Sequence, residues 1–142
     1  MTLQTGSILL VEDNIDDIDL TLMAFKRNNI ENQVIVAKSG EQALEILHGD
    51  GSEKAPLPSV VLMDINMPGM SGIEALKHIR SHPRTRALPV VILTSSKEDQ
   101  DIIEGYGNGA NSYIRKPVNF NEFVNAVKQL GMYWLLLNEP LP

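Results

Sequence analysis

Short apolar runs that end in polar residues constrain the fold of this chain most strongly. Three runs, at residues 8–11, 60–63 and 90–93, contain no polar residue, which is typical of strands buried on both faces of a parallel sheet. The residues that follow these runs are, in chain order, Glu12 with Asp13, then Asp64, then Thr94. Ligands of open α/β sheets bind outside the carboxyl ends of the strands. The pattern therefore predicts a sheet with acids and a hydroxyl gathered at one end.

Strand-like and helix-like segments alternate along the whole chain, which indicates a doubly wound α/β sheet of five parallel strands with helices on both faces. Of the two common strand orders, 2-1-3-4-5 brings Asp13, Asp64 and Thr94 to adjacent strand ends, with Lys116 on the next strand. We expect strands at 7–12, 33–37, 59–63, 89–93 and 112–114, and helices at 15–28, 40–48, 72–81, 98–106 and from about 119.

The helices show apolar spacing and capping residues. Ile18, Leu22 and Phe25 recur at helical spacing in the first one, and Asn14 and Ser39 are suited to cap the first and second. The fourth helix is expected to be weak, because the glycines of 105–109 each cost up to about 1 kcal/mol relative to alanine in a helix.

The length and composition predict a single soluble domain. Its 142 residues predict a single domain, 1–142, and the net charge of −6 argues against non-specific nucleic-acid binding. There is no cysteine. No apolar run reaches the roughly 20 residues that span a bilayer, and residues 1–7 lack the features of a signal peptide. We therefore expect a cytoplasmic protein that does not act at a membrane. His48, His78 and His82 lie in or beside helices without metal-ligand spacing and are expected at the surface.

Four motifs occur in the order and at the approximate spacing of one known family. They are Val11-Glu12-Asp13-Asn14, the stretch from Met63 to Gly72, Leu93-Thr94-Ser95-Ser96, and Tyr113-Ile114-Arg115-Lys116-Pro117. Over about residues 7–130 the chain resembles the receiver domain of two-component response regulators, which implies a flavodoxin-like fold. The long loop before the third strand and the aromatic end are similar to single-domain regulators paired with phytochrome kinases.

The resemblance implies a role for each motif. Asp64 would accept a phosphoryl group from a histidine of a partner sensor kinase, and the change would be passed to a protein effector or along a phosphorelay. Mg²⁺ would be held by Glu12, Asp13, Asp64 and the backbone carbonyl of Asn66. Thr94 and Lys116 would bind the phosphoryl oxygens, Tyr113 would change rotamer as Thr94 moves, and Lys116-Pro117 would be a cis peptide bond.

The residue chemistry is consistent with these roles. Mg²⁺ prefers oxygen ligands, a carboxylate can form an aspartyl phosphate, and lysine supplies a compact positive charge. The added phosphoryl group brings roughly −1.5 to −2 charges, which suits a switch between two conformations. Two departures from the family pattern are Glu12, where aspartate is frequent, and Ser95, where alanine or glycine is usual.

Each residue also has an ordinary structural interpretation. Asp13 with Asn14 could cap a helix, Asp64 could form a turn, and Thr94 could be another cap. Lys116 alone would be a surface charge and Tyr113 alone a core residue. Their coincidence at strand ends makes the structural interpretation improbable.

Two other functions compete with a phospho-accepting signalling protein that is not otherwise an enzyme. A phosphatase of the haloacid dehalogenase type uses similar residues but normally has a second aspartate two positions after the nucleophile, where this chain has Asn66. A receiver-like module that never carries phosphate would not need every chemical position filled. The kinase, the input signal, the target and the phosphoryl lifetime do not follow from the sequence.

The segment from about residue 131 to the end is unusually apolar. It continues the stripe of the last helix and either packs on its own domain or forms a homodimer. The residues expected at such a dimer interface are Phe123, Val127, Leu130, Tyr133 and Trp134.

Overall fold

The computed structural model describes residues 6–49, 57–94, 106–115 and 120–131, with the backbone alone for residues 94, 113, 115, 130 and 131. The strands are β1 (Ile8–Val11), β2 (Val34–Ala37), β3 (Val60–Met63), β4 (Val90–Thr94) and β5 (Ser112–Arg115). The helices are α1 (Ile15–Arg27), α2 (Gly40–His48), α3 (Gly72–Ser81) and α5 (Phe120–Gly131). The expected helix at 98–106 lies almost entirely outside the described residues, of which Tyr106 and Gly107 form a helical turn.

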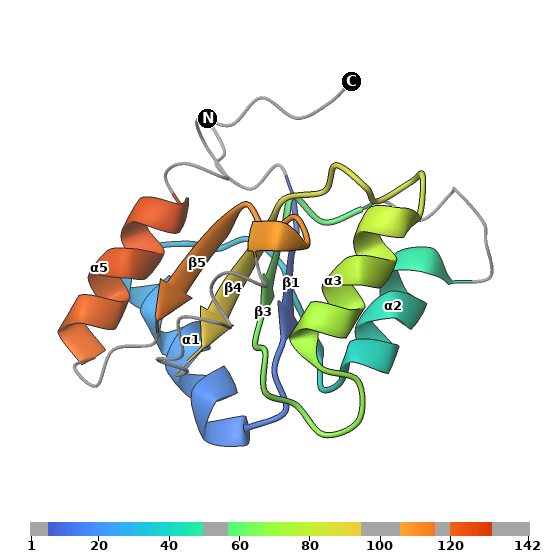
Figure 1. Cartoon of the computed structure of the whole chain (residues 1–142). Coiled ribbons are helices and arrows are strands. Elements are labelled where there is room, and N and C mark those ends of the chain that lie inside the picture. Colours follow the sequence, from blue (N-terminus) through green and yellow to red (C-terminus); the bar gives the residue numbers. More distant parts are fainter. Residues whose placement is uncertain (1–5, 50–56, 95–105, 116–119, 132–142) are drawn as a thin grey trace.

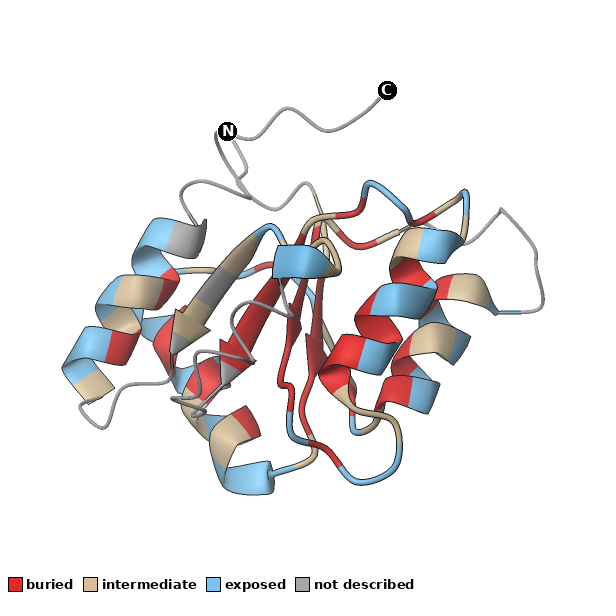
Figure 2. Cartoon of the chain, in the orientation of Figure 1, coloured by how far each residue is buried: buried red, intermediate tan, exposed pale blue. Residues whose placement is uncertain are grey.

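The five strands form one parallel sheet in the order β2-β1-β3-β4-β5, which confirms the predicted fold class and strand order. Helices α2 and α3 lie on one side of the sheet and α1 and α5 on the other (Figure 1). The apolar runs are continuous because both faces are covered: Leu9 and Val61 belong to the core cluster beneath α2 and α3, whereas Leu10 and Leu62 belong to the cluster beneath α1 and α5. Figure 2 shows the central strands buried along their length.

Each of the first three helices begins at a capping side chain. Asn14 accepts a hydrogen bond from the amide of Asp17 at 3.1 Å, Ser39 one from Gln42 at 3.0 Å, and Ser71 one from Glu74 at 3.2 Å. These bonds satisfy amide groups that have no partner within the helix. The caps at Asn14 and Ser39 are as the sequence predicted.

One of the three apolar residues expected on the buried face of α1 is exposed. Ile18, Ala24 and Phe25 are buried, but Leu22 is exposed and Thr21 takes the inner position instead. The Thr21 hydroxyl donates to the carbonyl of Asp17 at 2.8 Å, so a polar side chain can be buried there without losing its hydrogen bond.

Two residues expected at a dimer interface belong instead to the chain's own core. Phe123 is 1% exposed and Val127 is 2% exposed, and both pack in the cluster between α1, α5 and the sheet. The prediction was wrong for these two because one apolar stripe can cover a sheet as well as a partner. The Leu130 side chain, Tyr133 and Trp134 lie outside the described residues.

Two histidines are less exposed than expected. His48 and His82 are half-buried, and their rings stack at a centroid distance of 4.1 Å; His78 is exposed. The His48 Nε2 atom lies 3.1 Å from the Thr85 hydroxyl, which lies 2.8 Å from the carbonyl oxygen of Ile79. Since Thr85 has one hydroxyl hydrogen and Ile79 can only accept it, His48 donates from Nε2.

Within the described part of the chain, no helix combines the length and the apolar character needed to cross a bilayer.

Candidate metal centre

The acidic residues lie at the carboxyl-terminal end of the sheet because the strand ladders continue past the apolar runs. The amide of Glu12 donates to the carbonyl of Ala37 at 2.9 Å, and the amide of Asp64 donates to the carbonyl of Val11 at 3.0 Å. These bonds hold the backbone before Asp13 and at Asp64 on neighbouring strands. The sequence prediction that these acids meet at adjacent strand ends is therefore confirmed for β1 and β3.

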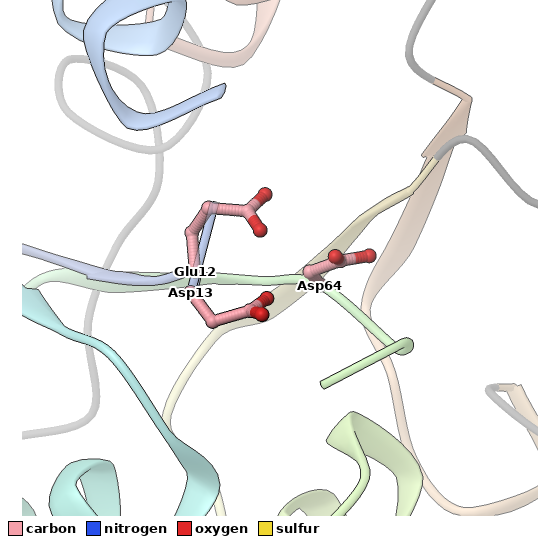
Figure 3. A group of neighbouring side chains, drawn as sticks. All are labelled: Glu12, Asp13 and Asp64. Carbon is pink, nitrogen blue, oxygen red and sulfur yellow. The ribbon is translucent and has the colours of Figure 1, made fainter. Parts of the chain in front are cut away.

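Three carboxylates converge there. One oxygen from each of Glu12, Asp13 and Asp64 lies within 4.8 Å of the other two. Figure 3 shows the side chains of Glu12 and Asp13 leaving the ribbon above and below, with both carboxyl groups turned toward Asp64. Glu12 and Asp64 are buried and Asp13 is half-buried. When ionised, carboxylates this close repel one another, so the arrangement favours a bound cation.

The donor set fits a hard divalent cation. Oxygen ligands of Mg²⁺ lie about 2.0–2.1 Å from the metal, so oxygens within 4.8 Å of one another are near the span of one coordination sphere. Partial exposure of Asp13 leaves access for water or for a phosphoryl group. The chemistry available is charge neutralisation beside a carboxylate nucleophile.

The loop after Asp64 is held against helix α3 by a close backbone approach. Gly72, the first residue of α3, donates its amide to the carbonyl of Ile65 at 2.9 Å. A Cβ atom on Gly72 would collide with the carbonyl oxygen of Asp64 and lie 2.9 Å from Cα of Ile65. Glycine at this position therefore lets the helix begin directly against the peptide of the candidate nucleophile.

Backbone amides beside the cluster face the carboxylates. The amide of Asn14 donates to Oε2 of Glu12 at 3.3 Å, and the amide of Asn66 lies 3.4 Å from Oδ1 of Asp64. This contact is made by the amide of Asn66, and the expected role of its backbone carbonyl as a metal ligand stays a prediction. The sequence interpretation missed the roles of Gly72 and of the Asn14 amide, since a backbone donor has no sequence signature and only the known motif marks Gly72.

The structure describes only part of the other predicted site residues. Thr94 ends β4 and pairs in register with Arg115, while Tyr113 pairs with Ile92. The backbone therefore carries Thr94 to the same end of the sheet as Asp64. The side chains of Thr94 and Tyr113, as well as Lys116 and the Lys116-Pro117 bond, lie outside what the structure describes.

Comparison with known proteins matches most of this chain to one family. The response regulator receiver domain model matches residues 8–128. The probable methanogenesis regulatory protein FilR2 of Methanothrix harundinacea is 38% identical over 128 residues, which cover 90% of this chain and 83% of that protein.

Two further relatives are response regulators of known structure. Rcp1 of Synechocystis is 33% identical, covering 90% of this chain and 88% of its own; its Mn²⁺-bound structure gives a TM-score of 0.84 at 30% identity, covering 96% and 99%. The phosphorylated cyanobacterial phytochrome response regulator RcpA gives a TM-score of 0.85 at 32% identity, covering 94% and 96%.

Members of this family accept a phosphoryl group on an aspartate and signal through the change that follows. The family match, the similarity over most of the length of these relatives and the acidic cluster at the strand ends agree with one another. The chain belongs to the response regulator receiver domain family.

Proposed function

We propose that Asp64 is the phosphoryl acceptor of this receiver domain, and that the whole chain is a single domain acting as a phosphorelay response regulator in the cytoplasm. The observation that carries the proposal is the meeting of Glu12, Asp13 and Asp64 within 4.8 Å at the ends of β1 and β3. Of the three, Asp64 alone comes from β3, the central strand of the sheet, and it precedes the loop that packs against α3.

Mg²⁺ is the proposed cofactor. Glu12, Asp13, Asp64 and the backbone carbonyl of Asn66 would hold it, and the Mn²⁺-bound structure of Rcp1 shows that one relative takes a divalent cation. When bound, the cation offsets negative charge on the carboxylates and on the transferring group. Glu12 reaches farther than an aspartate, so its contact can run through a water of the metal.

The transfer itself is a displacement at phosphorus. A carboxylate oxygen of Asp64 forms a bond to phosphorus as the bond from phosphorus to the donor histidine breaks, and that electron pair stays on the imidazole nitrogen. Thr94 and Lys116 are proposed to bind the phosphoryl oxygens. Tyr113 is proposed to change rotamer with Thr94. The only reactions catalysed are the domain's own phosphorylation and dephosphorylation.

The proposed partners are proteins. A sensor histidine kinase donates the group, and a phytochrome-type kinase is favoured by the similarity to RcpA. A protein effector or a phosphotransfer protein receives the signal. We also propose a homodimer through Leu130, Tyr133 and Trp134. Phe123 and Val127 take no part in it, because they are buried in the core.

Small phosphodonors test the acceptor directly. We expect acetyl phosphate with Mg²⁺ to add one phosphoryl group per chain, as measured by intact-protein mass spectrometry, and EDTA to prevent it. Asp64→Asn should lose the modification. Asp16→Asn, which removes an exposed acid of the first turn of α1, should keep it.

Two results would contradict the proposal. Modification that persists in Asp64→Asn would place the acceptor elsewhere. Continuous hydrolysis of phosphate esters by the wild-type protein would instead indicate a phosphatase.

A further inference from the structure

Arg80, near the end of α3, binds the chain that enters β5. Its Nε donates to the carbonyl of Gly109 at 2.9 Å and its Nη2 to the Asn111 side-chain oxygen at 2.9 Å. Its Nη1 donates to the carbonyl of Leu88 at 2.8 Å and lies 3.4 Å from that of Thr85. One guanidinium thus joins α3, the approach to β4 and the approach to β5.

The residues that Arg80 contacts before β5 form an entry segment, residues 109–111, that is also tied to β4. The amide of Asn111 donates to the carbonyl of Val90 at 2.8 Å, and the amide of Val90 donates to the Asn111 side-chain oxygen at 2.8 Å. That oxygen therefore accepts from both Val90 and Arg80. Gly109 has φ of +98°, and a Cβ there would lie 2.8 Å from the Arg80 Nε, so the chain passes close beside the Arg80 side chain.

This arrangement depends on the shape of arginine. All four acceptors are uncharged, and burial lowers the pKa of Arg80. The planar fork lets one side chain reach several acceptors in fixed directions, which an ammonium group cannot do. An apolar side chain could stabilise this place without the cost of burying a charge. The guanidinium group, in contrast, determines where the entry segment lies.

The position of the entry segment sets the position of the residues that respond to phosphorylation. Asn111 is two residues before Tyr113, which pairs with Ile92, and Thr94 pairs with Arg115. A slip of β5 by one residue would turn every side chain of the strand to the opposite face. Tyr113 can follow Thr94 only if β5 keeps its register while the site changes.

We propose that Arg80 is a positioning residue for the switch: it holds the entry segment still when Asp64 is phosphorylated, so that the change is confined to the other end of β4 and β5. The proposal rests on Asp64 as the proposed acceptor. It adds that Arg80 keeps the amino-terminal ends of β4 and β5 in place, while the ends near Asp64 rearrange.

Beryllofluoride, which mimics the phosphoryl group on aspartate, provides the test by NMR and amide hydrogen exchange. With Mg²⁺ and beryllofluoride, we expect amide shifts and exchange to change around Asp64 and Thr94 but to stay unchanged at Gly109, Asn111 and Val90. In Arg80→Lys, exchange at Asn111 and Val90 should be faster by roughly tenfold, and beryllofluoride should now alter both.

Arg84→Lys is the matched control. Arg84 is also half-buried and donates to a backbone carbonyl, that of Leu47 at 3.2 Å, but this contact is to α2 rather than to the entry segment. The control variant should leave the wild-type response intact.

The possible failures are distinct. No response around Asp64 in the wild type would overturn the proposed acceptor and, with it, this inference. A response that includes Gly109 and Asn111 in the wild type would overturn the inference alone, even if Arg80→Lys does not fold. The inference alone would also be overturned if Arg80→Lys responded to beryllofluoride in the same way as Arg84→Lys.

Discussion

The two ends of the sheet differ in how their polar and charged groups are arranged. At the carboxyl-terminal end, Glu12, Asp13 and Asp64 gather like charges within 4.8 Å. At the amino-terminal end, Arg80 reaches four uncharged acceptors, and the fully buried hydroxyl of Thr85 both accepts and donates a hydrogen bond.

The difference separates a site that can bind ligands from contacts that hold segments in place. Buried polar groups normally have hydrogen-bond partners, and the amino-terminal end follows this rule with contacts between segments far apart in sequence. At the carboxyl-terminal end, the three carboxylates repel one another, and a bound cation would relieve this repulsion. Without a cation the repulsion lowers stability, as is common at functional sites. Substitutions of the polar contacts at the amino-terminal end should therefore change stability and the placement of the strands, and substitutions of the three carboxylates should change the binding of ligands.

The largest expected effect is on metal binding. Asp13→Asn should weaken Mg²⁺ binding by about 100-fold, since even changes outside the ligand shell cost 10–100-fold. Without Mg²⁺, the variant should be slightly more stable than the wild type because one repulsive charge is gone. A titration with Mg²⁺ monitored by thermal unfolding measures both effects. Asp19→Asn, on the exposed side of α1, should match the wild type; unchanged Mg²⁺ binding in Asp13→Asn would contradict the metal site.

Gly72→Ala should lose about 2 kcal/mol of stability in urea unfolding, because the added Cβ overpacks against the backbone of Asp64 and Ile65. This outweighs the gain of up to about 1 kcal/mol that alanine gives within a helix. Gly107→Ala, where a Cβ meets nothing within 4 Å, should be neutral or stabilising. Equal effects of the two substitutions would argue against the close approach at Gly72.

Thr85→Val should lose about 1–1.5 kcal/mol because the carbonyl of Ile79 and the ring of His48 each lose a partner in a buried place. Thr85→Ser keeps the hydroxyl and should lose about 0.8 kcal/mol for one methyl group. The ¹⁵N shift of His48 Nε2 distinguishes them: it should stay at its wild-type value in the serine variant and move in the valine variant. A shift that is the same in both would mean that the hydrogen bond is not made.

The smallest expected effect is a dependence of stability on pH. Burial, and then the positive charges of His82, Arg84 and His78, lower the pKa of His48. The unfolded chain therefore binds more protons than the folded one as pH falls through about 6.5, and stability falls with it. His48→Gln should flatten the slope of the unfolding free energy between about pH 7.5 and 5.5, whereas His78→Gln should retain most of it. A steeper slope in His48→Gln would reverse the assigned sign.

The sequence predicted the carboxyl-terminal end of the sheet much better than the amino-terminal end. Apolar runs such as 60–63 identify buried strands, and the residue after each run must lie at the strand end, so Asp13 and Asp64 could be placed together. Arg80 and Thr85 carry no such signal, since their partners at Gly109 and His48 are distant in sequence and set by the tertiary fold. Phe123 and Val127 were misassigned because an apolar stripe does not specify what covers it.

Mapping of the phosphorylated residue tests the central claim most directly. After reaction with acetyl phosphate and Mg²⁺, borohydride reduction converts an aspartyl phosphate to homoserine, which peptide mass spectrometry locates in the chain. The account predicts homoserine at position 64 and at no other aspartate. Homoserine at position 13, or modified protein that yields no homoserine at all, would contradict it.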